Sequence, residues 1–215
     1  IEVPRKNGKT ALVAGVGLYM LVADGEPGAE IYSAATKREQ AKLSWSEAVR
    51  MRRASPTLSR MIQHYRSSDN LSVEATASKF QPLGADADTL DGLNVHGALI
   101  DELHAHRTRA VVDVLETATG ARRQPLQIEI TTAGSDQASV CYEHHEYSRS
   151  VLQGTAVDDS WFAFIASIDE GDDWTDERVW AKANPNLNVS VKADDLRRKC
   201  TRAEQLPAAQ NAFKR

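Results

Sequence analysis

The residue types and spacing best suited to chemistry occur at residues 3–10, whose sequence is Val-Pro-Arg-Lys-Asn-Gly-Lys-Thr. Gly8, Lys9 and Thr10 are expected to open a helix directly after a short apolar start. Backbone N–H groups, a helix N-terminus and one ammonium would then converge on a single spot, which suits the phosphates of a nucleotide. The full phosphate-loop pattern has a further glycine at the position that Val3 occupies in this chain.

Two adjacent carboxylates, Asp101 and Glu102, end an apolar run further along the chain. Hydrolysis of a γ-phosphate requires cationic groups, a magnesium ion and a positioned water. Lys9 can reach the β- and γ-phosphates, and the Thr10 hydroxyl can ligate Mg²⁺. Asp101, at the end of a buried strand, would hold that ion mostly through water, and Glu102 would polarise the attacking water as general base. The two motifs together predict an ATPase that uses ATP and Mg²⁺.

Other polar residues are candidates for sensing the γ-phosphate. Arg5 lies inside the loop and can touch the γ-phosphate of its own subunit, as a charge sensor. Residues 131–134 (Thr-Thr-Ala-Gly) follow a core strand, so they are expected at the carboxyl edge of the sheet, where ligands bind in open α/β sheets. An arginine finger supplied to a neighbour has four candidates among which the sequence does not choose: Arg107, Arg109, Arg122 and Arg123.

The elements that must position these residues alternate between strands and helices. Strands are expected over residues 30–34, 95–101, 126–130 and 161–168, with two more within 70–82. Helices are expected over residues 8–23, 108–119 and about 135–152, where Ser135 or Asp136 would cap, and after Pro56. A long helix from Thr36 has a capping-box pattern with Glu39 and a buried face that includes Leu43. The alternation predicts an α/β fold with a mainly parallel sheet and helices on both faces.

The composition of the sequence changes after Ile168. An acidic run, a turn at residues 184–186 (Asn-Pro-Asn) and two short helices are expected there. We therefore expect an ATPase domain over residues 1–168 and a small helical linker subdomain over residues 169–215. Both ends look cut, because almost no strand precedes the loop and the last residues stop inside an ordered segment. The chain is expected to be part of a larger protein, and its adenine contacts are not predicted.

Composition limits the partners. Among 215 residues the net charge is −4, which argues against a surface coated with basic groups, although local arginine clusters can still bind phosphate backbones. The apolar runs are shorter than the roughly 18–20 residues that span a membrane, so no membrane partner is expected. Cys141 and Cys200 are too few for a disulfide framework and lack metal-ligand spacing.

The combination of motifs resembles the large terminase subunit of tailed bacteriophages, specifically the HK97-like group. The motifs occur in the family's order and span essentially the whole chain. They are residues 3–10, 90–94 (Leu-Asp-Gly-Leu-Asn), 99–106 (Leu-Ile-Asp-Glu-Leu-His-Ala-His), 130–134 (Ile-Thr-Thr-Ala-Gly) and 180–187 (Trp-Ala-Lys-Ala-Asn-Pro-Asn-Leu).

The resemblance implies a P-loop NTPase fold of the ASCE type and a DNA-packaging motor. Residues of the loop would bind nucleotide: Pro4, Arg5, Lys6, Asn7, Gly8, Lys9 and Thr10. Lys9 and Thr10 resemble the Walker A pair, and Asp101 and Glu102 resemble the Walker B aspartate and the catalytic glutamate. Arg5 is similar to the loop arginine. Coupling of hydrolysis to movement would fall to Thr131, Thr132, Ala133 and Gly134.

The family's partners are implied in the same way. They are double-stranded DNA, the portal protein, the small terminase subunit and further copies of the chain in a ring that is usually pentameric. Such a motor works in the cytoplasm of the infected bacterial host, transiently at the portal vertex of the procapsid. Family members also carry a C-terminal nuclease of RNase H-like fold, which is expected only in the full-length protein and not within this chain.

Two alternatives remain open at this point. A helicase-like or regulatory module would bind ATP without moving DNA. A metal-dependent hydrolase would use four histidines as ligands, although their spacing fits no familiar set: His104, His106, His144 and His145.

Overall fold

The computed structural model describes residues 1–84, 92–120 and 122–214, which form two compact units. One unit combines Ile1–Lys9 with the chain from Thr131 onward, and the other contains Thr10–Ile130. Of the motif at residues 90–94, Leu90 and Asp91 lie outside the described residues.

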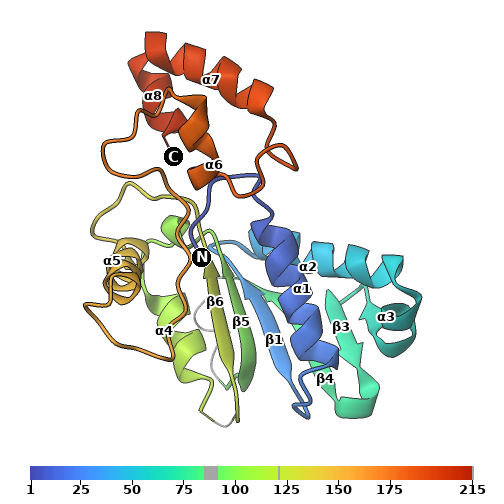
Figure 1. Cartoon of the computed structure of the whole chain (residues 1–215). Helices are drawn as coiled ribbons and strands as arrows, with labels where there is room; N and C mark the ends of the chain where they lie inside the picture. The colour runs from blue at the N-terminus through green and yellow to red at the C-terminus, as the bar shows by residue number, and fades with distance from the viewer. Residues whose placement is uncertain (85–91, 121, 215) are drawn as a thin grey trace. The chain divides into compact units, whose positions relative to one another are not determined.

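A six-stranded sheet forms the centre of the unit Thr10–Ile130, with the strand order β2-β3-β4-β1-β5-β6. Strand β1 lies parallel to both β4 and β5, and β5 lies parallel to β6, whereas β2 and β3 extend the sheet with antiparallel pairs. Figure 1 shows β1, β5 and β6 side by side. The strands are β1 (Glu30–Ala34), β2 (Gln63–Tyr65), β3 (Asn70–Val73), β4 (Ser78–Leu83), β5 (Val95–Asp101) and β6 (Leu126–Ile130). The predicted mainly parallel α/β fold is confirmed.

The same unit contains helices. They are α1 (Lys9–Val22), α2 (Arg38–Ala54), α3 (Pro56–Met61) and α4 (Ala110–Thr117), with short 3₁₀ turns η1 (Glu74–Thr76) and η3 (Leu103–Ala105). Every residue of β5 is buried, so both faces of this central strand are covered. A continuous apolar run such as residues 97–100 is typical of a parallel strand covered on both faces, which is why the sequence located β5 correctly.

Helix α1 packs closely on β5 through small residues. A Cβ atom placed on Gly17 would come within 2.9 Å of Leu99 Cδ1, and one placed on Gly97 would come within 2.9 Å of Met20 Sδ. The successive contacts run in opposite directions along the two elements, so α1 is antiparallel to β5. Thr10, near the start of α1, therefore lies toward the carboxyl end of β5, where Asp101 is located.

Helix α2 differs from its prediction at its start and on its buried face. Lys37 is the N-cap residue and makes no side-chain cap, while the Thr36 hydroxyl donates to Gln40 Oε1 at 2.7 Å. The predicted capping box is therefore wrong. Leu43 is 61% exposed, and Ser44 is buried instead. Leu43 lies two residues from Ala41, about 200° around the helix, so it cannot share that residue's face.

Other boundaries shift by a few residues. Ser55 caps α3 by accepting a hydrogen bond from Leu58 N at 3.3 Å, but no residue of that helix is buried. Strand β2 was not predicted, because its three residues at the sheet edge carry no apolar alternation. Helix α4 is shorter than predicted, and its buried residues are Val111, Val112 and Leu115.

The other unit is mainly helical. It contains α5 (Val140–Leu152), η4 (Glu177–Val179), α6 (Trp180–Ala183), α7 (Ala193–Gln205) and α8 (Pro207–Phe213). Helix α5 begins later than predicted. Ser139 caps it by accepting from Tyr142 N at 3.3 Å, while Asp136 belongs to the preceding turn and accepts from Ala138 N at 3.0 Å. The predicted boundary near Asp169 stays a prediction.

The expected core strand over residues 161–168 is wrong. Only one isolated parallel bridge forms there, between Glu2 and Ile165, with Glu2 N donating to Phe164 O at 2.8 Å. Phe162 is 79% exposed, so its alternation with Phe164 does not mark a buried face. Within the described part of the chain, no helix is long and apolar enough to cross a membrane.

Candidate functional site

The start of the phosphate loop is held in extended conformation within its unit. Val3 N donates to Thr131 O at 3.2 Å, and Thr131 N donates to Ile1 O at 3.0 Å. Glu2 is bridged on its other side to Ile165. The structure therefore brings the first residues of the predicted nucleotide-binding loop directly beside Thr131, the first residue of the predicted coupling motif.

Two residues of the loop have a left-handed backbone conformation. Lys6 and Gly8 both have positive φ, at 69° and 83°. Backbone that alternates into the left-handed region turns successive N–H groups toward one point, where an anion binds. Glycine adopts this conformation without the penalty that a side chain brings, which explains Gly8, whereas Lys6 carries a small strain.

Lys9 lies at the start of α1 and is only 9% exposed. Its Nζ donates to Val3 O at 2.6 Å and to Pro4 O at 3.3 Å. Burying an ammonium is costly unless it is hydrogen-bonded, and the loop's own carbonyl oxygens satisfy part of that requirement. The charge is thereby kept against the loop.

Asp101 is the last residue of β5 and is 7% exposed. Ser44, which faces it from α2, donates from Oγ to Asp101 Oδ2 at 3.0 Å. A hydrogen bond to a carboxylate stabilises the charged form and fixes its orientation. Sequence reasoning missed Ser44, and the only available signal was a small polar residue on the apolar face of α2.

Glu102 follows in the left-handed conformation, with φ 50° and ψ 53°. A residue other than glycine is strained there by roughly 1–2 kcal/mol, and such strain concentrates at functional sites. Its Oε2 is shielded from solvent, lies 3.2 Å from His104 Nδ1 and makes no hydrogen bond.

Thr10 and Asp101 fit a magnesium ion by chemistry. A hydroxyl and a carboxylate are both hard oxygen donors, and Mg²⁺ typically takes one or two protein ligands and keeps several waters. The antiparallel packing of α1 on β5 directs Thr10 toward the Asp101 end of the strand.

The histidines give no support to a zinc enzyme. Among the residues that the structure describes, no group of three or more His, Cys, Asp and Glu side chains is placed to hold a metal. His106 is buried, and burial lowers its pKa because the charged ring would lose its solvation.

The remaining predicted residues differ in their surroundings. Thr131 and Thr132 are buried, and Thr131 Oγ1 donates to Thr132 O at 2.9 Å. Arg5 is exposed in the loop. Of the finger candidates, Arg107 and Arg123 are exposed, and Arg109, which directly precedes α4, has its Nε 3.2 Å from Asp113 of that helix.

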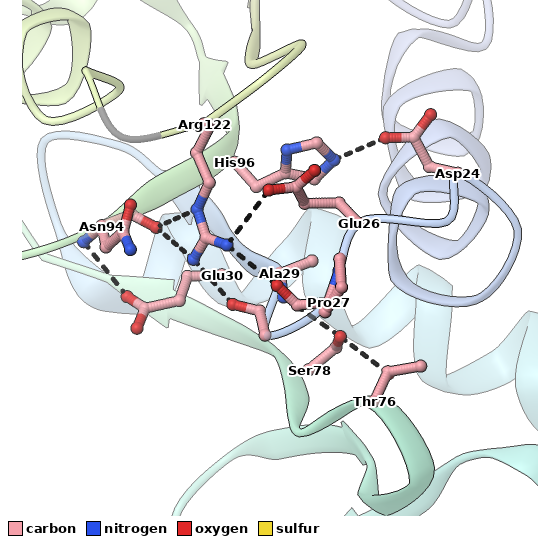
Figure 2. A network of polar contacts seen from close by, with 11 residues as sticks. Asp24, Glu26, Pro27, Ala29, Glu30, Thr76, Ser78, Asn94, His96 and Arg122 are labelled. Atoms are coloured by element: carbon pink, nitrogen blue, oxygen red, sulfur yellow. Dashed lines mark hydrogen bonds and ion pairs between the residues drawn. The ribbon is translucent and has the colours of Figure 1, made fainter.

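Arg122 is held differently from the other three finger candidates. Its side chain is 6% exposed, and its guanidinium donates to Pro27 O at 3.1 Å, Gly28 O at 2.6 Å and Asn94 O at 3.1 Å. Figure 2 shows these backbone groups and Glu26 around the guanidinium. Arg122 therefore fastens the loops before β1 and β5 to the segment before β6, which removes it from the set of fingers that can reach a neighbour.

Comparison with known proteins decides the family. A model of the terminase large subunit ATPase domain matches residues 1–150, and a model of the terminase large subunit endonuclease domain matches residues 155–215. The chain belongs to the terminase large subunit family. The expected resemblance is confirmed, and the region with the phosphate loop and acid pair is an ATPase domain of P-loop type.

Two curated relatives of this terminase chain are similar over different lengths. The large terminase subunit of Enterobacteria phage HK97 is 28% identical over 220 residues, which cover 100% of this chain and 42% of that protein. Protein YmfN of Escherichia coli K12 is 43% identical over 124 residues, which cover 58% of this chain and 27% of that protein. The chain thus spans less than half the length of either relative.

Solved structures agree. The crystal structure of the HK97 large terminase matches with a TM-score of 0.88 at 27% identity, covering 100% of this chain and 44% of that one. The ATPase domain of the Thermus phage P74-26 large terminase matches with a TM-score of 0.51 at 20% identity, covering 63% and 59%, and supports the fold alone. In the part matched by the endonuclease model, the described residues form helices and no named strand.

Proposed function

We propose that this chain binds and hydrolyses ATP with Mg²⁺ as the motor domain of a DNA-packaging terminase. Residues 4–10 bind the nucleotide, with the N–H groups of the loop and the Lys9 ammonium on its phosphates. The observation that carries the proposal is the Glu102 carboxylate, whose shielded Oε2 has no hydrogen bond. It directly follows an aspartate that Ser44 orients.

The residues divide the work of hydrolysis. Thr10 and Asp101 hold Mg²⁺, which when bound supplies positive charge at the phosphate oxygens. Glu102 accepts a proton from the attacking water, and the nitrogen His104 Nδ1 lies 3.2 Å from its Oε2. Arg5 neutralises charge that develops on the γ-phosphate.

Coupling of hydrolysis to movement begins at Thr131, Thr132, Ala133 and Gly134. The hydrogen bond from Val3 N to Thr131 O supports this role, because a shift of the phosphate loop is transmitted directly to the segment that leads into α5. The motor's further partners are double-stranded DNA, the portal protein, the small terminase subunit and other copies in a ring, which we take to be a pentamer. It acts in the cytoplasm of the infected host, at the portal vertex of the procapsid.

A packaging assay with the full-length protein tests this proposal. Procapsids, DNA and ATP are mixed with parental protein or the Glu102→Gln variant, and the DNA protected from nuclease digestion is measured. We expect ATP-dependent protection with the parental protein and none with Glu102→Gln. No protection with the parental protein, together with an ATPase rate that ignores both DNA and self-association, would favour the regulatory or helicase-like module.

A further inference from the structure

We propose that Asn184 and Asn186 are positioning residues for the phosphate loop. They lie in the part of the chain that matches the endonuclease model, beyond the residues that match the ATPase model. The C-terminal segment would thus help to set the conformation of the phosphate loop. This inference rests on the proposed ATP-binding function and adds the residues that give the loop its shape.

The contacts converge on Asn7 at the centre of the loop. The Asn7 side chain donates from Nδ2 to Asn184 Oδ1 at 3.1 Å and accepts at Oδ1 from the backbone N–H of Asn186 at 3.1 Å. Asn186 in turn donates from Nδ2 to the backbone oxygen of Asn7 at 3.0 Å. The two asparagines thus bind both ends of the Asn7 amide and its main chain.

A second contact holds the neighbouring peptide group. Ser190 donates from Oγ to Lys6 O at 2.5 Å. The carbonyl oxygens of Lys6 and Asn7 therefore both point toward the C-terminal segment. In a trans peptide the C=O and the following N–H point in opposite directions. The N–H groups of Asn7 and Gly8 are consequently turned away from the segment, as an anion bound in the loop requires.

The approach is close enough to constrain sequence. A Cβ atom on Gly8 would lie 3.0 Å from Asn186 Nδ2, so a larger residue there would displace this side chain. We call Asn184, Asn186 and Ser190 the clamp. The clamp is itself supported, because Asn184 donates from Nδ2 to Trp180 O at 3.0 Å and Trp180 is buried. The Asn186 carbonyl also accepts from Val189 N at 3.0 Å.

These contacts favour a positioning role over a simple tether. A tether would fix the chain anywhere along the loop, whereas these hydrogen bonds select the peptide groups on either side of Asn7, between the two residues with positive φ. Holding a binding loop in its bound shape lowers the entropy lost on binding and so raises affinity.

The test measures binding of a fluorescent ATP analogue with Mg²⁺ to the full chain carrying Asn186→Ala or Ser190→Ala. We expect the Kd to rise about tenfold for Asn186→Ala, the effect of losing hydrogen bonds that shape the loop. Ser190 is exposed, so its variant is expected to fold normally and to raise the Kd several-fold. Asn211→Ala, at an exposed position of α8, is the matched control and should keep the parental Kd.

Thermal unfolding of each variant separates affinity from stability. Parental Kd values in folded Asn186→Ala and Ser190→Ala proteins would overturn the inference, whatever their unfolding temperatures. If Asn186→Ala does not fold, the Ser190→Ala measurement decides. Lys9→Ala, measured alongside, tests the proposed function separately. If Lys9→Ala binds the analogue with the parental Kd, the proposed ATP site is wrong. If Lys9→Ala loses binding while the clamp variants keep the parental Kd, only the proposed role of the clamp is wrong.

Discussion

Ser44 donates a hydrogen bond from Oγ to Asp101 Oδ2 at 3.0 Å, joining α2 to the carboxyl end of β5. The hydrogen bond engages Oδ2, and because the carboxylate is planar it also fixes the position of Oδ1. An aspartate that must ligate Mg²⁺ through water gains from such a fixed geometry, because second-shell hydrogen bonds orient metal ligands.

Replacing Ser44 with alanine is expected to weaken magnesium use by the ATPase. Second-shell losses typically cost 10–100-fold in metal affinity, so the Mg²⁺ concentration for half-maximal hydrolysis should rise by about that factor. Ser33→Ala is the matched control, since the Ser33 hydroxyl is also buried but donates to Ala41 O. Equal Mg²⁺ requirements in the two variants would show that Ser44 acts only through stability.

Two glycines of α1 should respond in opposite ways to alanine. Gly17→Ala places a methyl group 2.9 Å from both Leu99 Cδ1 and Phe80 Cε1, so overpacking should lower the free energy of unfolding by about 1–3 kcal/mol. Gly15 has nothing within 4 Å of its Cβ position, so Gly15→Ala should raise it by about 0.5–1 kcal/mol through helix propensity. Urea unfolding measures both. A stabilising Gly17→Ala would contradict the close packing of α1 on Leu99 and Phe80.

Arg122→Lys is expected to destabilise the protein by about 2–4 kcal/mol. A lysine cannot reproduce the fork that serves the carbonyl oxygens of Pro27, Gly28 and Asn94, and these lose their donor. Arg123→Lys at the neighbouring exposed position should change stability by less than about 0.5 kcal/mol. If Arg122→Lys instead kept full stability while the assembled ring lost ATP turnover, Arg122 would again be a candidate for the arginine finger.

The lowered pKa of His64 predicts a loss of stability in mild acid. Partial burial, reinforced by Arg53, Arg52 and Arg66, lowers the pKa of His64 below its ordinary 6.5. The unfolded chain then binds more protons than the folded chain below pH 6.5, so this contribution to stability is complete above that pH and declines as the pH falls. The free energy of unfolding of His64→Gln should fall less steeply than that of the parent between about pH 7 and pH 5.5. Parallel curves would contradict the assignment.

The acid pair and its strand were predictable because their signal is local. A run of apolar residues that ends in two carboxylates specifies a buried strand with polar groups at its carboxyl end, and β5 is buried throughout. The capping box at Thr36 failed although it is also a local pattern. The Thr36 hydroxyl has Gln40 within reach and bonds to that side chain instead of the helix N-terminus.

Contacts between residues far apart in the sequence could not be predicted. Residues 184–186 were recognised as a turn, but nothing local indicates that Asn184 bonds to Asn7, 177 residues away. The strand expected around Phe164 failed for a related reason. A strand needs a partner along its length, and this segment is bridged at one residue only, to Glu2.

ATP binding and hydrolysis by the Glu102→Gln and Lys9→Ala variants test the central claim most directly. Glu102→Gln should bind ATP with the parental Kd and hydrolyse it at least about 100-fold more slowly, because a glutamine cannot accept the proton of the attacking water. Lys9→Ala should lose ATP binding. Hydrolysis at the parental rate by Glu102→Gln would contradict the catalytic assignment.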